Sequence, residues 1–163
     1  MRKVISKGIV KGAGFMNLKN RMNYFKVGSE AMEHVMSLEQ YVRKIKLDRR
    51  LKALIKVYVS KLNGCSYCIA MHTKEAKKLK ADENILQNIM DWKELTALEE
   101  KEKVAFELAE HITFVSELRV DDSLYDKVRS HYNEKEYFDL VMLINQINSW
   151  NRLAISMGNS AND

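Results

Sequence analysis

The sequence predicts an all-α protein, and two observations carry that prediction. The 163 residues include no proline and six glycines, so residues that break helices are scarce. Apolar side chains recur at the spacing of one helix face in segment after segment. The length suits one compact domain with a buried core. We therefore expect a single domain of about seven helices.

Each predicted helix starts at a side chain that can accept a hydrogen bond from the first turn, or directly after a glycine break. We predict a first helix from Ser29 to Ile45, a second over 49–62 between the cap Asp48 and the break Asn63-Gly64, and a third from near Cys65 to about Leu79. A short fourth helix follows Asp82, and the capping-box spacing Thr96–Glu99 opens a fifth that runs to about Glu117. A sixth starts at Asp122, and the last runs from Asn133–Glu136 to Met157, where Gly158 ends it.

The charge is distributed unevenly along the chain. Residues 1–29 hold seven Lys or Arg and no acid, although the whole chain has a net charge of +5. The remainder is therefore slightly acidic, and a basic face for nucleic acid is not expected. We interpret residues 1–21 as a basic, poorly ordered extension, 22–158 as the helical domain and 159–163 as a tail. No apolar run approaches the roughly 18–20 residues of a membrane span, so we expect no membrane association.

The stretch NGCSYCIAMH, residues 63–72, holds the two cysteines of the chain. On a helix, Cys65 and Cys68 are three residues apart and Cys68 and His72 four apart, so all three share one stripe. A helix N-terminus favours an anion, which stabilises a thiolate. Cys68 could then attack a peroxide, Cys65 could resolve the sulfenic acid to a disulfide, and His72 could carry the proton. Two cysteines without an evident signal peptide suggest a reducing, cytoplasmic compartment.

Other interpretations of the same residues are open at this point. The pair could be two small buried thiols of the core. A zinc site needs four ligands, and His34, His111 or His131 would have to supply the fourth. A second C-x-x-C is missing from the sequence. We therefore favour redox chemistry and expect neither a metal nor a cofactor.

The segment VSKLNGCSYCIAMHTKEAKK, residues 59–78, resembles the signature of alkylhydroperoxidase D-like proteins in the carboxymuconolactone decarboxylase-like superfamily. That signature reads V-S-x-x-N-x-C-x-Y-C-x-x-x-H. The segments at 22–42, 91–113 and 144–156 (INQINSWNRLAIS) resemble further parts of the same family. The resemblance covers about residues 22–157.

The resemblance implies an all-helical fold that assembles into homo-oligomers, commonly trimers or hexamers. It implies a thiol-dependent peroxidase that reduces hydroperoxides, an antioxidant activity. By the same resemblance Cys68 is the cysteine that is oxidised, Cys65 is the proton donor and resolving thiol, and His72 belongs to the proton relay. A dithiol, in some members a lipoylated protein, reduces the oxidised pair.

One position departs from the family pattern. Peroxidase members carry a glutamate where this chain has Ala53, and the neighbouring Lys52 and Lys56 are expected to face elsewhere on their helix. We predict that Glu110 supplies the missing carboxylate and count it with Cys65, Cys68 and His72 as a catalytic residue. The alternative is a redox-sensing or binding member of the family that has lost peroxidase activity.

Overall fold

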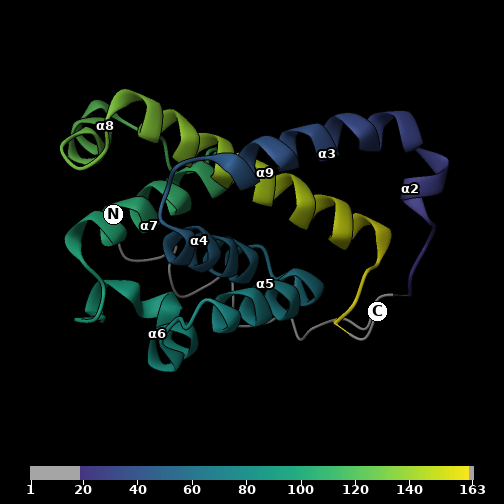
Figure 1. The fold of residues 1–163 in the computed structure, drawn as a ribbon, viewed down its shortest axis with the longest axis horizontal. Helices are drawn as coiled ribbons and strands as arrows, with labels where there is room; N and C mark the ends of the chain where they lie inside the picture. Colours follow the sequence, from purple (N-terminus) through teal and green to yellow (C-terminus); the bar gives the residue numbers. More distant parts are fainter. Residues whose placement is uncertain (1–18, 162–163) are drawn as a thin grey trace.

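The structure is a computed structural model that describes residues 19–161, and within that range it consists of helices joined by turns and loops (Figure 1). Most of the predicted basic extension, residues 1–18, lies outside the described residues. The predicted all-α fold is confirmed. The elements are α2 (Tyr24–Val27), α3 (Ser29–Lys44), α4 (Arg49–Leu62), α5 (Ser66–Lys78), α6 (Glu83–Asn88), the 3-10 helix η1 (Ile89–Glu94), α7 (Glu100–Thr113), α8 (Asp122–Arg129) and α9 (Glu134–Met157).

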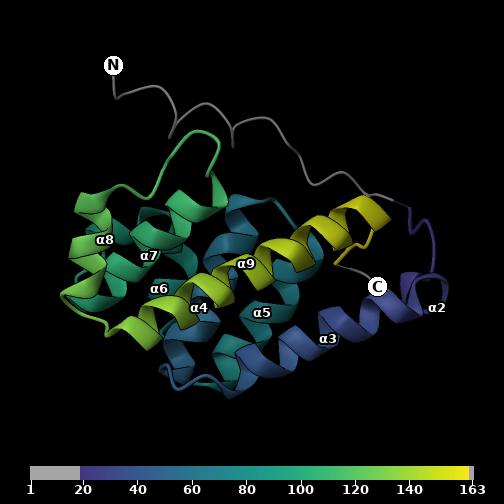
Figure 2. The ribbon, with the colours of Figure 1, turned by 90° about the horizontal axis from the view of Figure 1, so that it is seen from above.

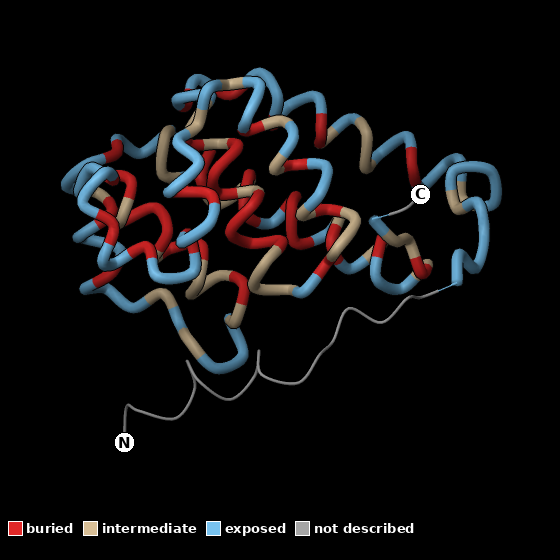
Figure 3. Tube along the Cα trace, turned by 90° about the horizontal axis from the view of Figure 1, so that it is seen from below, coloured by how far each residue is buried: buried red, intermediate tan, exposed pale blue. Residues whose placement is uncertain are grey.

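Helix α4 lies at the centre of the molecule and contacts α5, α7 and α9 (Figure 2). Its apolar residues cover more than one face, which is the pattern of a buried helix rather than a surface helix. Leu54, Ile55, Val57 and Val59 are all completely buried. The buried residues gather around this helix, while α2 and most of α3 are exposed (Figure 3). The core therefore holds α4 and the start of α5 rigidly in place.

Several helix starts agree with the sequence prediction. The Asp48 carboxylate accepts a hydrogen bond from the Leu51 N–H at 2.8 Å, and Asp82 accepts one from the Asn84 N–H at 2.7 Å. Asn133 and Glu136 form the predicted capping box. Gly158 ends α9 with a φ of 75°, a left-handed conformation that glycine adopts without strain.

Other boundaries differ from the prediction. The capping box before α7 joins Glu99 to Glu102 instead of Thr96 to Glu99, so this helix starts one turn later, and it already ends at Thr113. The cap of α8 is Asp121, which accepts from the Leu124 N–H at 2.9 Å, and not Asp122. In both cases the sequence holds a second side chain that can act as the cap, Glu99 for α7 and Asp121 for α8, which spacing alone does not distinguish.

The two ends of the described chain lie side by side (Figure 1). The Arg21 N–H donates to the Met157 carbonyl at 2.9 Å, and its guanidinium donates to the Ser156 carbonyl at 2.6 Å. A Cβ atom at Gly158 would come within 2.2 Å of the Lys19 carbonyl oxygen, so the close approach of the two segments requires glycine. None of the helices between residues 19 and 161 is long and apolar enough to cross a membrane.

Candidate active site

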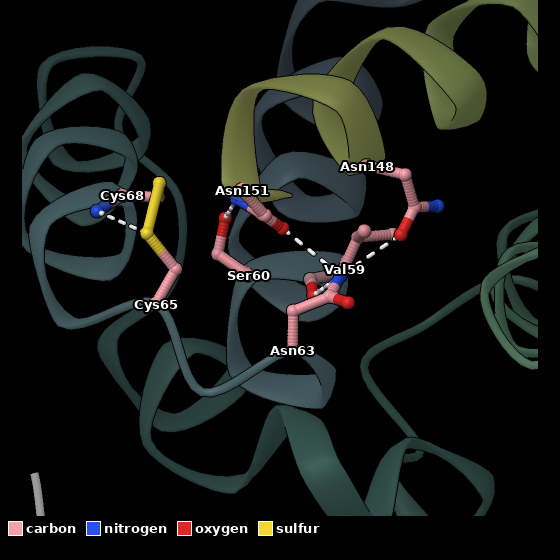
Figure 4. The surroundings of a disulfide bond; sticks show 7 residues. All are labelled: Val59, Ser60, Asn63, Cys65, Cys68, Asn148 and Asn151. Atoms are coloured by element: carbon pink, nitrogen blue, oxygen red, sulfur yellow. Dashed lines mark hydrogen bonds between the residues drawn. A yellow bond between two sulfur atoms is a disulfide. The ribbon is translucent and has the colours of Figure 1, made fainter. Parts of the chain in front are cut away.

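A polar network holds the loop that leads from α4 to the cysteines (Figure 4). The Asn63 amide donates to Asn148 at 2.9 Å and to Asn151 at 3.0 Å, both on α9. The Asn151 amide donates to the Ser60 hydroxyl at 3.1 Å. Gly64 follows with a φ of 68°, and the Cys65 N–H then donates to the Ser60 carbonyl at 3.1 Å. The polar residues of two separate sequence segments thus fix the position of Cys65.

The two cysteines are joined by a disulfide at the N-terminus of α5 (Figure 4). Cys65 is the N-cap residue, and its sulfur accepts a hydrogen bond from the Cys68 N–H at 3.3 Å. A free N–H of the first turn therefore points at the Cys65 sulfur, which stabilises negative charge on that atom. The predicted pairing of the two sulfurs is confirmed, and both residues are buried.

His72 lies one turn further along α5 and is also buried. Its Nδ1 is 3.0 Å from Oε2 of Glu75, and Oε1 of Glu75 is 3.6 Å from Nζ of Lys56 on α4. The hydrogen bond from His72, together with the Lys56 charge, lowers the pKa of Glu75 to about 2, against the effect of partial burial. Glu75 is therefore a carboxylate near neutral pH.

The charge of Glu75 determines which nitrogen of His72 carries the proton. A carboxylate accepts hydrogen bonds and cannot donate them, so Nδ1 of a neutral His72 is the donor and Nε2 the acceptor. Nε2 is buried and has no hydrogen-bond partner among the described side chains. The ring is thus held in the tautomer that a proton acceptor at Nε2 requires.

A cavity of about 1020 Å³ lies beside the disulfide, between α2, α3, α4, α5 and α9. Cys68, His72 and Glu75 line it, whereas Cys65 does not. Cys68 therefore lines a space large enough for an organic molecule, whereas Cys65 is buried behind it and bound through its N–H to the Ser60 carbonyl. A reagent in this cavity would meet Cys68 first.

The structure brings three of the four predicted catalytic residues together. Cys65, Cys68 and His72 share the start of α5, but Glu110 on α7 is not among the residues that line the cavity. Its charge acts instead on Tyr58, whose pKa is raised by burial and then by Glu110. The catalytic role of Glu110 stays a prediction.

Lys52 and Lys56 face elsewhere on α4 than Ala53, as expected, and both line the cavity. Ala53, which stands where the family carries glutamate, is part of the main hydrophobic core and 1% exposed. The carboxylate that contacts His72 comes from Glu75, which lies three residues after His72 on α5. That spacing was readable from the sequence, because side chains three apart on a helix are neighbours.

The described residues do not form the four-ligand zinc site considered above. Within residues 19–161 there is no cluster of three or more His, Cys, Asp or Glu side chains arranged to hold a metal ion. His111, one candidate for the fourth ligand, has its Nδ1 2.8 Å from the Arg119 carbonyl oxygen.

Comparison with known proteins agrees with the geometry. The model of the carboxymuconolactone decarboxylase family matches residues 29–111. The uncharacterised protein YdfG of Bacillus subtilis (strain 168) is 44% identical over 144 residues, which cover 88% of this chain and 98% of that protein.

Two solved structures have the same fold. A protein of unknown function from Agrobacterium tumefaciens, whose name refers to the antioxidant defence protein AhpD, gives a TM-score of 0.83 at 32% identity over 87% of this chain and 97% of that one. The apo form of the debrominase Bmp8 gives a TM-score of 0.70 at 18% identity, covering 82% and 72% of the two chains, which shows a shared fold alone. The chain described here belongs to the carboxymuconolactone decarboxylase family and has an AhpD-like helical fold.

Proposed function

We propose that this protein is a thiol-dependent peroxidase that reduces organic hydroperoxides through Cys65 and Cys68 and is regenerated by a dithiol. The observation that carries the proposal is the disulfide at a helix N-terminus with Cys68 and His72 on the wall of one cavity. A disulfide is the product that the oxidative half of such a cycle leaves behind. The family and the AhpD-like fold agree with an enzyme of this class.

In the oxidative half-cycle, Nε2 of His72 accepts the proton of the Cys68 thiol. The thiolate attacks the terminal oxygen of the hydroperoxide, so an S–O bond forms and the O–O bond breaks. The alkoxide takes the proton from His72 and leaves as an alcohol, and Cys68 becomes a sulfenic acid. The Cys65 thiol then attacks the Cys68 sulfur, so an S–S bond forms and the S–O bond breaks, and the hydroxyl group leaves as water with the proton of the Cys65 thiol.

In the reductive half-cycle, a dithiol donates the two electrons. Its first thiolate attacks the Cys68 sulfur, the one that lines the cavity, and Cys65 leaves as a thiolate. The N–H that points at Cys65 favours this leaving group because it stabilises the negative charge. The second thiol of the reductant then resolves the mixed disulfide. A lipoyl group is one dithiol that fits this step.

Glu75 is the positioning residue of this mechanism. Its hydrogen bond to Nδ1 keeps Nε2 free to accept a proton, and its charge stabilises the imidazolium that results. Lys56 holds the other carboxylate oxygen from α4. We propose that this pair replaces the glutamate that the family carries at the position of Ala53.

The test is steady-state turnover of cumene hydroperoxide with dihydrolipoamide as reductant. Cys68→Ser is expected to lower the rate by on the order of a thousandfold or more, because the nucleophile is lost. Ser66→Ala, a change between the two cysteines that removes no thiol, serves as the matched control and is expected to retain activity. Unchanged turnover in Cys68→Ser would contradict the proposal.

The second candidate is a redox sensor without peroxidase activity, and the replacement of the family glutamate by Ala53 favours it. A sensor would form its disulfide reversibly with oxidant but would not consume peroxide catalytically. Wild-type protein that shows reversible disulfide formation and no turnover with any hydroperoxide would support the sensor. Mass measurement in solution in both redox states would then show whether the disulfide changes a trimeric or hexameric assembly.

A further inference from the structure

The cavity beside the disulfide has two chemically different ends. Aromatic and thioether side chains line the cavity together with Cys68. Tyr67 precedes it, Met71 lies one turn later, and the ring centroid of Phe25 is 6.4 Å from that of Trp150 on α9. Ala154, one turn beyond Trp150, packs directly against the two cysteines. The end of the cavity that holds the reactive sulfur is therefore apolar.

The other end of the cavity is basic. Because α4 and α5 form an antiparallel hairpin, the first half of α4 lies beside the last half of α5, as the Lys56–Glu75 ion pair shows. Six basic and two acidic side chains line the cavity. The acids Glu39 and Glu75 are already paired with Arg43 and Lys56. Four cations remain without an ion-pair partner among the described residues: Arg49, Lys52, Lys74 and Lys78.

Lys52 is the most enclosed of these four cations. Its Nζ donates to the carbonyls of Arg43 and Ile45 at 3.2 and 3.1 Å, which are neutral acceptors and leave its charge uncompensated. Burial, and then repulsion by Lys56 and Arg49, lower its pKa, while Glu75 and Asp48 oppose this shift more weakly. Lys56 and Arg49 therefore repel the charge of Lys52, and a bound anion would relieve that repulsion.

The distance between the apolar end and the basic end of the cavity sets the length of a ligand that contacts both. A helix rises about 1.5 Å per residue, so Lys74 and Lys78 start about 9 and 15 Å further along α5 than Cys68. A small neutral hydroperoxide at Cys68 would not reach these lysines. Near Cys68, Nε2 of His72 is a buried polar atom without a hydrogen-bond partner among the described residues, and it could bond the peroxide group.

We propose that the preferred substrate is an amphipathic organic anion, an aliphatic hydroperoxide whose carboxylate is separated from the peroxide group by a hydrocarbon chain. The peroxide group lies at Cys68 and His72, the chain lies along the apolar wall, and the carboxylate lies among Lys52, Lys74 and Lys78. The hydroperoxide group of this substrate rests on the proposed peroxidase function, whereas the preference for an anion does not depend on it. Lys52 is half-buried and Lys74 and Lys78 are exposed, so the attraction of a carboxylate is strongest at Lys52 and is screened by salt at the other two. This attraction adds selectivity between acids and their neutral analogues.

Binding tests the charge preference without any turnover. Isothermal titration of the oxidised protein with decanoate and with decan-1-ol compares an acid with a neutral molecule of the same chain length. Decanoate is expected to bind at least about tenfold more tightly, and added salt is expected to reduce this difference. Equal affinities for the two ligands would overturn the proposal.

Variants locate the carboxylate. The double substitution Lys52→Gln and Lys74→Gln is expected to weaken decanoate binding about tenfold and to leave decan-1-ol binding unchanged. Lys77→Gln removes one charge from α5 outside the cavity lining and is the matched control for Lys78→Gln, which removes one charge from the lining. Lys78→Gln alone provides an exposed variant in case the double variant folds poorly. A loss of affinity as large in Lys77→Gln would show that only the overall charge matters, which contradicts the proposal.

Turnover separates this proposal from the proposed function. With linoleic acid hydroperoxide and its methyl ester as substrates, kcat/KM is expected to be at least about tenfold higher for the acid. Reduction of both at equal rates would keep the peroxidase and reject the anionic substrate. Reduction of neither would reject the peroxidase, and the decanoate titration would then still decide whether the cavity selects anions.

Discussion

The two sulfur atoms of one disulfide lie in different surroundings. On the Cys65 side, Ser60, Asn63, Asn148 and Asn151 satisfy one another in a closed network. On the Cys68 side, Nε2 of His72 is buried without a hydrogen-bond partner and the half-buried Lys52 has no ion-pair partner, both within residues 19–161. Buried polar groups normally find partners, and exceptions call for a ligand or a chemical role. The Cys65 side therefore fixes the position of the disulfide, and the Cys68 side is where a substrate would bind and react.

The largest expected effect distinguishes the two sulfurs directly. After one equivalent of hydroperoxide, Cys65→Ser protein is expected to accumulate sulfenic acid on Cys68, because the resolving thiol is missing. Cys68→Ser protein is expected to form little sulfenic acid, because Cys65 does not line the cavity. Mass spectrometry after dimedone labelling measures both. Equal labelling of the two variants would show that the difference in surroundings does not control reactivity.

The second prediction concerns the carboxylate on the cavity side. Glu75→Gln is expected to lower kcat for hydroperoxide reduction about 10- to 100-fold with little change in KM, since it removes the charge that supports His72 as a proton acceptor. Glu110→Gln is expected to leave kcat within about twofold of wild type, because Glu110 does not line the cavity. A large loss of kcat in Glu110→Gln with little change in Glu75→Gln would instead place Glu110 in the proton relay.

The third prediction concerns the network side. Asn151 is completely buried, and Asn151→Ala leaves the Ser60 hydroxyl and the Asn63 amide without this partner. We expect the free energy of unfolding to fall by about 2–3 kcal/mol. Asn145→Ala, an exposed position on the same helix, is the control. Urea unfolding of the reduced proteins measures both, and equal stabilities would mean that the network adds little to the fold.

The smallest effect is a pH dependence. The pKa of Glu75 is lowered from its usual 4.5 to about 2, so its contribution to stability is fully present above pH 4.5 and is lost as pH falls toward 2. The melting temperature of wild type should therefore exceed that of Glu75→Gln at pH 7, and the difference should shrink below pH 4.5. A difference that persists unchanged at pH 3 would show that the charge of Glu75, held by His72 and Lys56, does not cause it.

Local sequence signals predicted the helices and the cysteine pair well. Asp48, Asp82 and Asn133 cap the predicted helices because a cap involves residues only two or three positions apart. The same is true of Cys65 and Cys68, which are paired as their spacing allowed. The short helix α2 and the 3-10 helix η1 were missed, since four to six residues carry too little periodicity to read.

Contacts between elements were harder to predict. The ion pair between Lys56 and Glu75, which the α4–α5 hairpin brings together, was not predicted. Glu110 was chosen by its place in a family segment, and in the structure its charge acts on Tyr58. Asn63 and Asn151 stand 88 residues apart, and no local pattern predicts their hydrogen bond. These contacts are hard to predict for one reason: the register between two helices depends on how the whole core packs.

The joined chain ends have a practical consequence for recombinant versions of the protein. Arg21 is bonded to the end of α9, and three residues later α2 supplies Tyr24 and Phe25 to the cavity wall. A protein shortened to begin at Met22 would lose both bonds of Arg21 while its cysteines remained intact. The boundary chosen for expression would thus alter the shape of the cavity, and substrate preferences measured on a shortened protein would differ from those of the full chain.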